Sequence, residues 1–497
     1  MEQLSGLDAS FLYLETPTLH MHVEMVTVFD PSTVPGGYSF AKMQAQIASR
    51  THQAPVFRRL LVEVPFRLGH PVWVDDPDFD IDYHVRRTAV PGPGGLRELA
   101  DLAGDIASRQ LDRTKPLWEI WIVEGLEGGR IAVIAKMHHS TVDGMSGAAL
   151  LSVLFDLDAD PGPEPEPPGE VGDTRIPSSA ELISEAMAAR VMRPFEMTRD
   201  VLRTAQRLLN VRRVRNEPEH RAPHSRAALP LSAPRTSFNG SLTRRRQVAL
   251  AAIGLDDVKR LKNATGTTVN DVVLAICTGA LRRFLIDGQE LPDKPLVAVV
   301  PVSVHPDHDA PYGSNKVSSM FVQLPAHLED PLERLQVIRE GTMGAKEEHN
   351  ALGADMLLNW AEHATPNTFA AAARLYSRMR MADRHRPIAN LIVSNVPGPD
   401  FPLYLAGAEM VTGFPLGPVM DGIGVNITIM SYRGVLYWGI ISCPETMPKV
   451  WQLAADVPLA LDELLAAAGE PPAVFRSVES ADAEAASTSV PAATPDV

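Results

Sequence analysis

The sequence predicts a mixed α/β (α+β) protein in which strands and helices alternate. Valine- and isoleucine-rich runs at Met21–Phe29 and Ile131–His138 are typical of strands. An amphipathic pattern over Leu96–Leu111 predicts a helix between them. The chain of 497 residues is 45% hydrophobic and 22% charged, as expected for a folded protein with a sizeable core. This alternation favours sheets with helices packed on their faces.

The second half of the chain, from Thr236 to about Ala468, repeats the alternation of strands and helices. We expect strands at Leu296–Val304, Val317–Leu324, Ala389–Ser394, Gly424–Tyr432 and Val435–Cys443. We expect helices at Asp256–Ala264, Asn270–Leu285 and Pro331–Ala351.

The composition changes abruptly between the two halves. Asp160–Gly172 is so rich in proline, glycine and glutamate that we expect an extended linker. A helical pattern with many arginines follows at Pro177–Arg215, and Pro194 is expected to kink it. This helix is either a solvated helix that packs one face on the protein or a helix whose cations meet anionic lipid.

These features predict four regions. They are an N-terminal half at 1–158, a linker with the arginine-rich helix at 159–234, a C-terminal half at 235–468 and a disordered tail at 469–497. No segment reaches the roughly 18 uninterrupted apolar residues of a membrane-spanning helix, and the N-terminus lacks the pattern of a signal peptide. We therefore expect a cytoplasmic protein, with peripheral contact at the inner membrane face as an alternative.

Charge and cysteine usage narrow the partners. The formal net charge of −15 argues against a nucleic-acid partner, which requires a broad basic face. The two cysteines, Cys277 and Cys443, lie in apolar runs outside any metal-binding pattern, so we expect buried thiols and no metal.

The segment Lys136-Met-His-His-Ser-Thr-Val-Asp-Gly144 carries the chemistry. It follows the strand that ends at His138, and an apolar helix is expected after it at Gly147–Phe155. An imidazole titrates near neutral pH, so His139 is suited to act as a general base. Asp143 can orient the ring or shape the loop, and Gly144 permits close backbone approach. A metal site, a structural His–Asp hydrogen bond and a nucleophile triad remain alternatives, although the chain has no GxSxG motif.

HHSTVDG matches the HHxxxDG signature of the coenzyme A-dependent acyltransferase superfamily. Other segments are more specific: LSGLDASFLYLETPTLHMHV, PLWEIWIVEGL, VNDVVLA and SNVPGP. Their order and spacing resemble the bacterial wax ester synthase/diacylglycerol acyltransferase family over about residues 4 to 465. The resemblance implies two chloramphenicol-acetyltransferase-like halves, each a mixed sheet flanked by helices, with the active-site channel between them.

The resemblance also implies roles for the motif residues. His139 deprotonates the acceptor hydroxyl, whose oxygen attacks the thioester in one step without an acyl-enzyme. His138 supports it, and Asp143 shapes the loop.

Donors that stabilise the oxyanion are the second requirement of such a reaction. Asn270 and Asp271 are candidates to shape that site, as are Ser394 and Asn395. The alternatives are that Asn270 caps the helix that follows it, and that Asn395 forms a turn with the prolines after it.

Basic residues near the motif raise one further question. Lys136 is expected either to contact a phosphate of coenzyme A or to be solvated. The run Arg244–Arg246 is a second candidate for contact with a coenzyme A phosphate.

The resemblance therefore implies an O-acyltransferase that moves a long-chain acyl group from acyl-CoA to diacylglycerol, with fatty alcohols as a second acceptor class. Acyl-CoA is a co-substrate, and we expect no permanently bound cofactor. Two alternatives remain: a non-catalytic or weakly active lipid-binding homologue, and a condensation enzyme that uses carrier-protein thioesters.

Overall fold

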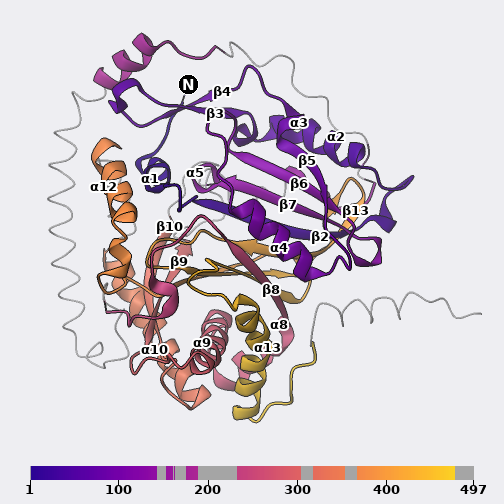
Figure 1. Ribbon diagram of the computed structural model, residues 1–497. Coiled ribbons are helices and arrows are strands. Elements are labelled where there is room, and N and C mark those ends of the chain that lie inside the picture. Colours follow the sequence, from indigo (N-terminus) through magenta and orange to yellow (C-terminus); the bar gives the residue numbers. More distant parts are fainter. Residues whose placement is uncertain are drawn as a thin grey trace, which may run out of the picture.

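The computed structural model describes residues 2–142, 153–160, 162, 175–188, 232–303, 317–352 and 366–475. Two six-stranded sheets dominate them, and Figure 1 shows the purple N-terminal sheet above the sheet formed by the second half of the chain. The expected mixed α/β architecture with two sheet-containing halves is confirmed.

The first sheet has the strand order β12-β13-β2-β7-β6-β5. In chain order the strands are β2 (His22–Asp30), β5 (Val85–Ala89), β6 (Trp118–Glu124), β7 (Ile131–His138), β12 (Tyr404–Leu405) and β13 (Ala408–Leu416). β7 lies between antiparallel β2 and β6 and is buried along almost its whole length. This explains the apolar run from Ile131 to Ala135, because neither face of this part of the strand meets much water.

Helix α4 (Leu96–Ala107) packs its apolar stripe between the first sheet and strand β8. It ends earlier than predicted, with Ser108 as its C-cap, and the next N–H, that of Arg109, bonds to the carbonyl of Ile106 at 3.2 Å and so leaves the α-helical pattern. The other helices of this half are α1 (Gly6–Leu14), α2 (Phe40–Arg50), α3 (Ile81–His84) and α5 (His139–Val142).

The second sheet has the order β10-β9-β11-β14-β15-β8. Its strands are β8 (Gln247–Gly254), β9 (Leu296–Ser303), β10 (Val317–Leu324), β11 (Leu391–Val396), β14 (Val425–Tyr432) and β15 (Val435–Ser442). The helices of this half are α8 (Leu255–Thr265), α9 (Val269–Asp287), α10 (Pro331–Leu352), α12 (Pro366–Arg378) and α13 (Val450–Ala467).

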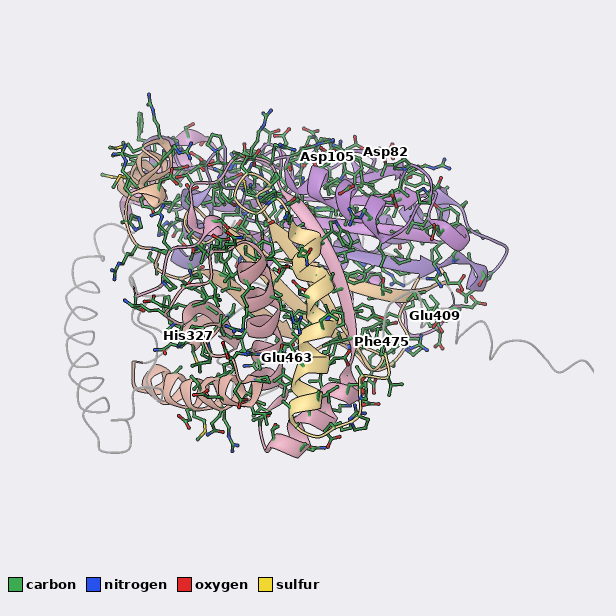
Figure 2. All side chains as sticks on the ribbon, turned by 60° about the horizontal axis from the view of Figure 1, so that its bottom comes forward. Asp82, Asp105, His327, Glu409, Glu463 and Phe475 are labelled. Carbon is green, nitrogen blue, oxygen red and sulfur yellow. The ribbon has the colours of Figure 1, made fainter. Side chains whose placement is uncertain are left out.

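Four of these helices, α8, α9, α10 and α13, pack on this sheet (Figure 1). Glu463 of α13, labelled in Figure 2, accepts a hydrogen bond from the fully buried Arg334 of α10 at 2.8 Å.

A small third sheet supports the N-terminus. It has the order β1-β4-β3, formed by β1 (Glu2–Gln3), β3 (Arg59–Val62) and β4 (Val72–Asp75). Residues 179–188 are helical, and Leu182 and Ala186 pack against Val64, Val72 and Val74. The start of the predicted arginine-rich helix therefore packs one face on the protein, whereas the arginines from Arg190 onward lie outside the described residues.

The C-terminal half also contributes to the first sheet. β13 pairs antiparallel with β2, from Glu409 opposite Asp30 to Leu416 opposite Glu24. β13 also packs against β14 and β15 of the second sheet. The division of the chain into four regions remains a prediction. The boundary at residue 235 does not divide the strands of the two sheets, because the first sheet includes residues 404–416.

Most predicted elements are confirmed to within a few residues, and the strands at Ile131–His138 and Val317–Leu324 agree fully. The elements that the prediction missed include β6, β8, β13, α12 and α13, as well as α1, α2 and β5 of the N-terminal half. The buried residues of α13 recur every three or four positions, as at Val450, Leu453, Val457, Leu461 and Leu464, so the prediction overlooked a helical stripe that the sequence contains. The linker Asp160–Gly172, all but the last residues of the expected helix Gly147–Phe155, and the tail from 476 lie outside the described residues.

A substitution at Gly439 tests the close approach of the two sheets. A Cβ atom on Gly439 of β15 lies 1.9 Å from the backbone oxygen of Pro415 in β13. We expect Gly439→Ala to lower the free energy of unfolding by about 3 kcal/mol, because backbone must move to relieve the clash. Urea unfolding followed by circular dichroism measures this. Gly288→Ala is the control, since its nearest contact is an ordinary 3.4 Å and its unfolding curve should match wild type.

Candidate active site

The His138–His139 pair lies where β7 ends and α5 begins. The backbone N–H of His138 donates to the carbonyl of Leu117 at 3.0 Å, and that of His139 donates to the carbonyl of Met21 at 2.8 Å. Because the pair is bonded to the segments leading into both neighbouring strands, its backbone position is set by the sheet and not by a free loop.

His138 is held inside the protein by the turn that follows it. Its Nδ1 accepts a hydrogen bond from the backbone N–H of Ser140 at 3.1 Å and lies 2.7 Å from the Ser140 hydroxyl. Thr141 Oγ1 donates to the His138 carbonyl at 2.7 Å. Burial lowers the pKa of His138 well below its ordinary value, so the ring is neutral. His138 therefore anchors the turn that carries His139.

His139 is the more accessible of the two histidines. Its ring stacks on Phe11 of α1, with centroids 4.0 Å apart and an interplanar angle of 29°. Burial lowers the pKa of His139 to about 4. Its Nδ1 is buried without a hydrogen-bond partner among the described residues, and Asp143 and Gly144 lie outside those residues. The roles of Asp143 and Gly144 remain predictions.

Lys136 is a buried structural residue. Its side chain is 1% exposed, and its Nζ donates to the carbonyls of Ile106 at 3.1 Å and Arg109 at 3.0 Å, with Glu119 at 3.5 Å. Both interpretations of Lys136, as a phosphate ligand and as a solvated lysine, are therefore wrong. The adjacent strand position Glu24 is also buried, and burial raises its pKa to about 8.

Arg246, the last residue of the basic run Arg244–Arg246, is structural as well, whereas Arg244 and Arg245 are exposed, and their contact with a coenzyme A phosphate remains a prediction. Arg246 is buried, and its guanidinium donates to the backbone carbonyls of Thr243, Arg245 and Thr18. Thr18 lies in the loop that follows α1. Arg245 pairs with Glu445 at 3.2 Å. His20 and His22 are buried beside the site, with ring centroids 5.6 Å apart.

The Asn270–Asp271 pair begins helix α9. The N-cap is Thr268, so the alternative that Asn270 caps this helix is wrong. Asp271 Oδ2 accepts from the Thr268 N–H at 3.0 Å and the Thr268 hydroxyl at 2.8 Å, which is a capping box. Asp271 Oδ1 accepts from Thr342 of α10 at 2.7 Å. Asp271 thus joins two helices of the second half.

Asn395 is half-buried in β11, opposite Ile429 of β14, and Ser394 precedes it. The turn after it lies close to β14, where the Gly398 N–H donates to the Ser431 hydroxyl at 3.1 Å. Among the described residues, no hydrogen bond joins Asn270, Asp271 or Asn395 to the histidine pair. Their contribution to an oxyanion site remains a prediction.

The sequence analysis missed the contribution of the N-terminal segment. Phe11 stacks on His139, and Glu15 Oε2 lies 3.7 Å from His138 Nε2. Glu15 and Arg113 also line a cavity of about 330 Å³, whose walls include Leu12, Leu61, Leu111 and Ala370. Both Phe11 and Glu15 belong to LSGLDASFLYLETPT. This segment indicates the family resemblance, but neither residue was predicted to lie in the site.

The described ranges contain neither a metal-binding cluster nor a membrane-spanning helix. There, no group of three or more histidine, cysteine or carboxylate side chains is placed to hold a metal ion. No helix in the same part of the chain is both long and apolar enough to cross a membrane.

The fold recurs in solved structures. The wax ester synthase/diacylglycerol acyltransferase from Marinobacter aquaeolei VT8 aligns with a TM-score of 0.64 and 28% identity, covering 94% of this chain and all of that one. The starter condensation domain of rhizomide synthetase, solved with C8-CoA and Leu-SNAC, shares the fold at a TM-score of 0.52 and 13% identity over 96% of each chain. With the paired histidines at the strand end, this two-sheet fold defines an acyltransferase.

Sequence comparison assigns the family. The model of the wax ester synthase/diacylglycerol acyltransferase catalytic domain matches residues 4–273, and that of the WS/DGAT C-terminal domain matches 313–465. A Mycobacterium tuberculosis protein named as a diacylglycerol O-acyltransferase is 43% identical over 95% of this chain and 92% of its own. Another from that organism is 33% identical over 94% and 100%. The chain belongs to the wax ester synthase/diacylglycerol acyltransferase family.

A substitution at Asp271 separates helix capping from a role in the site. Asp271→Ala leaves the Thr268 N–H and the Thr342 hydroxyl without their acceptor, so we expect the free energy of unfolding to fall by about 1–3 kcal/mol. Denaturant unfolding measures this. Asp256→Ala, which removes an exposed carboxylate from the first turn of α8, is the control and should change little. A wild-type unfolding curve with lost activity would instead place Asp271 in the reaction.

Proposed function

We propose that this protein transfers a long-chain acyl group from acyl-CoA to the free hydroxyl of diacylglycerol and so makes triacylglycerol. The observation that carries the proposal is the neutral imidazole of His139, fixed at the end of β7 and against Phe11. The names of the relatives at 43% and 33% identity support diacylglycerol as the acceptor.

The reaction requires one proton to be moved, and His139 carries it. As the acceptor oxygen attacks the thioester carbonyl carbon, its proton passes to His139. The tetrahedral oxyanion then collapses, the carbon–sulfur bond breaks, and the thiolate of coenzyme A takes the proton back. No proton is gained or lost overall, and no acyl-enzyme forms.

The low pKa of His139 fits both directions of this transfer. A ring with a pKa of about 4 is neutral at physiological pH and can accept the proton. A thiol has a reference pKa of roughly 8.5, so return of the proton from the imidazolium to the departing thiolate is downhill. The low pKa therefore costs base strength but favours regeneration of the catalyst.

Fatty alcohols are the second proposed acceptor, which would make the product a wax ester. The same proton transfer serves any primary or secondary hydroxyl, and the relative from Marinobacter aquaeolei VT8 carries both activities in its name. Family membership does not favour a lipid-binding homologue without activity or a carrier-protein condensation enzyme.

Peripheral contact with a membrane or a lipid droplet is also a proposal. It is supported by the apolar acceptor, which partitions into lipid, and by the arginine-rich pattern that continues beyond residue 188. The described start of that helix, 179–188, packs on the small sheet and is not available for such contact on that face.

Replacement of the proposed base tests the function. We expect His139→Ala to lower kcat by about 10²–10⁴-fold with long-chain acyl-CoA and diacylglycerol, the range that general-base catalysis contributes. Release of the thiol and formation of neutral lipid are followed together, with hexadecanol offered in parallel. His52→Ala, a histidine of the N-terminal half outside the site, should retain wild-type kcat. Equal activity of His139→Ala and wild type would contradict the proposal.

The pH dependence follows from the lowered pKa. Only the neutral ring accepts a proton, so kcat/KM of wild type should stay level as the pH falls through 6.5 and decline only near the pKa of about 4. Unfolded His139 binds its proton near pH 6.5, before the folded state does, so this residue's contribution to stability is lost as the pH falls from about 6.5 toward 4. In His139→Gln, unfolding should depend less on pH in that window. An acid limb centred near pH 6.5 in wild type would show that the ring is not desolvated.

A further inference from the structure

We propose that Glu15 is a positioning residue, which holds the His138 ring in the orientation that supports His139, and that Arg113 holds Glu15 in place. The inference rests on the proposed base catalysis by His139. Glu15 is the residue at which α1 ends, and its Oε2 atom lies 3.7 Å from Nε2 of His138. The two side chains are only 6% and 1% exposed, so water does not separate them freely.

The hydrogen bonds of His138 determine which ring nitrogen carries the proton. Nδ1 accepts from the backbone N–H of Ser140, so the proton of the neutral ring must be on Nε2. That Nε2 has no hydrogen-bond acceptor within 3.5 Å among the described residues, and the carboxylate of Glu15 is the charged group that faces it. A movement of less than about 1 Å turns this contact into a hydrogen bond.

Arg113 fixes the carboxylate from the opposite side. Its Nε donates to Glu15 Oε2 at 2.9 Å, and a second guanidinium nitrogen pairs with the same oxygen. The guanidinium also donates to the carbonyl of Leu12 at 2.9 Å, near the C-terminus of α1, where a cation is favourable. Gln110 donates to Glu15 Oε1 at 3.2 Å. Two residues, Arg113 and Gln110, therefore hold the carboxylate, while Oε2 also lies 3.7 Å from His138 Nε2.

Burying a carboxylate opposes folding, and here burial raises the pKa of Glu15 although the charge of Arg113 acts to lower it. An apolar residue at the end of α1 would avoid this cost. The arrangement is explained if the carboxylate is required beside His138, because the turn from His138 to Thr141 then has an anchor at each ring nitrogen: Ser140 at Nδ1 and Glu15 at Nε2.

Glu15 also lines the cavity of about 330 Å³, so a role in substrate binding must be distinguished from positioning. A residue that only lines a substrate pocket changes KM, whereas one that places catalytic groups changes kcat. Glu63 provides a matched control. It lines the same cavity and lies 3.8 Å from another nitrogen of Arg113, but it does not face His138.

The kinetic test compares three variants with acyl-CoA and diacylglycerol. We expect Glu15→Ala to lower kcat by about 10²-fold with KM within about threefold of wild type, since a misplaced catalytic group costs this much. Glu15→Gln keeps an acceptor oxygen at the same distance from the backbone. Its kcat should therefore be about tenfold higher than that of Glu15→Ala. Glu63→Ala should keep wild-type kcat. A rise in KM with unchanged kcat, or equal losses in Glu15→Ala and Glu15→Gln, would overturn the proposal.

A spectroscopic test works even if acyl transfer to diacylglycerol is not the reaction. Nitrogen-15 NMR of histidine-labelled protein reports which ring nitrogen is protonated, and the His138 signal is identified by its loss in His138→Asn. Ser140 keeps the proton on Nε2 in every variant, so the Nε2 resonance is the readout. We expect this resonance to shift in Glu15→Ala, which removes the carboxylate, and to stay close to its wild-type position in Glu15→Gln. If Glu15→Ala does not fold, the shift is expected in Arg113→Met, which frees the carboxylate. An unchanged Nε2 resonance in Glu15→Ala, or in Arg113→Met where Glu15→Ala does not fold, would refute the role of Glu15.

Discussion

Two backbone hydrogen bonds fix the position of the His138–His139 pair, the proposed site of the reaction. The N–H groups of His138 and His139 bond to the carbonyls of Leu117 and Met21, which precede the two strands on either side of β7. Because these bonds continue the sheet, the histidines are as well placed as the strand itself. Sites on regular elements are more precise than sites on loops, since their backbone has little freedom. The Phe11 ring then limits the orientation of His139 from the side of α1.

Behind the histidines lies a layer of buried ionisable groups that differ in how they are stabilised. Lys136 has two backbone carbonyls and Glu119 as partners, whereas Glu24 has no hydrogen-bond partner among the described residues, and burial raises its pKa to about 8. Near neutral pH, Glu24 is therefore largely protonated, and the layer carries less charge than its sequence indicates. A protonated Glu24 carries no negative charge that could stabilise a charged imidazole. Burial also lowers the pKa of His22 and His138, so both rings are neutral.

The sequence predicted the strand that carries the motif and the histidine pair at its end, because both signals are local, whereas the role of His139 as base stays a proposal. An apolar strand followed by two histidines can be recognised without knowledge of its neighbours. Glu15 could not be found in this way, since it lies 123 positions before His138 and meets it only through packing of α1. Lys136 was misinterpreted for the related reason that a lysine in a strand looks solvent-exposed until its carbonyl partners are known. Strand β13 was missed because its pairing partner, β2, belongs to the other half of the chain.

The pairing of β13 with β2 has a consequence for how the chain is made. Until residues 408–416 leave the ribosome, β2 is an edge strand whose backbone groups lack partners on one side. At roughly 5–20 residues per second, that interval is on the order of tens of seconds. Throughout it the half that bears the histidines has an incomplete sheet, so the nascent protein exposes a site for wrong strand pairing. Synthesis through residue 416 therefore precedes completion of the sheet that positions the His138–His139 pair.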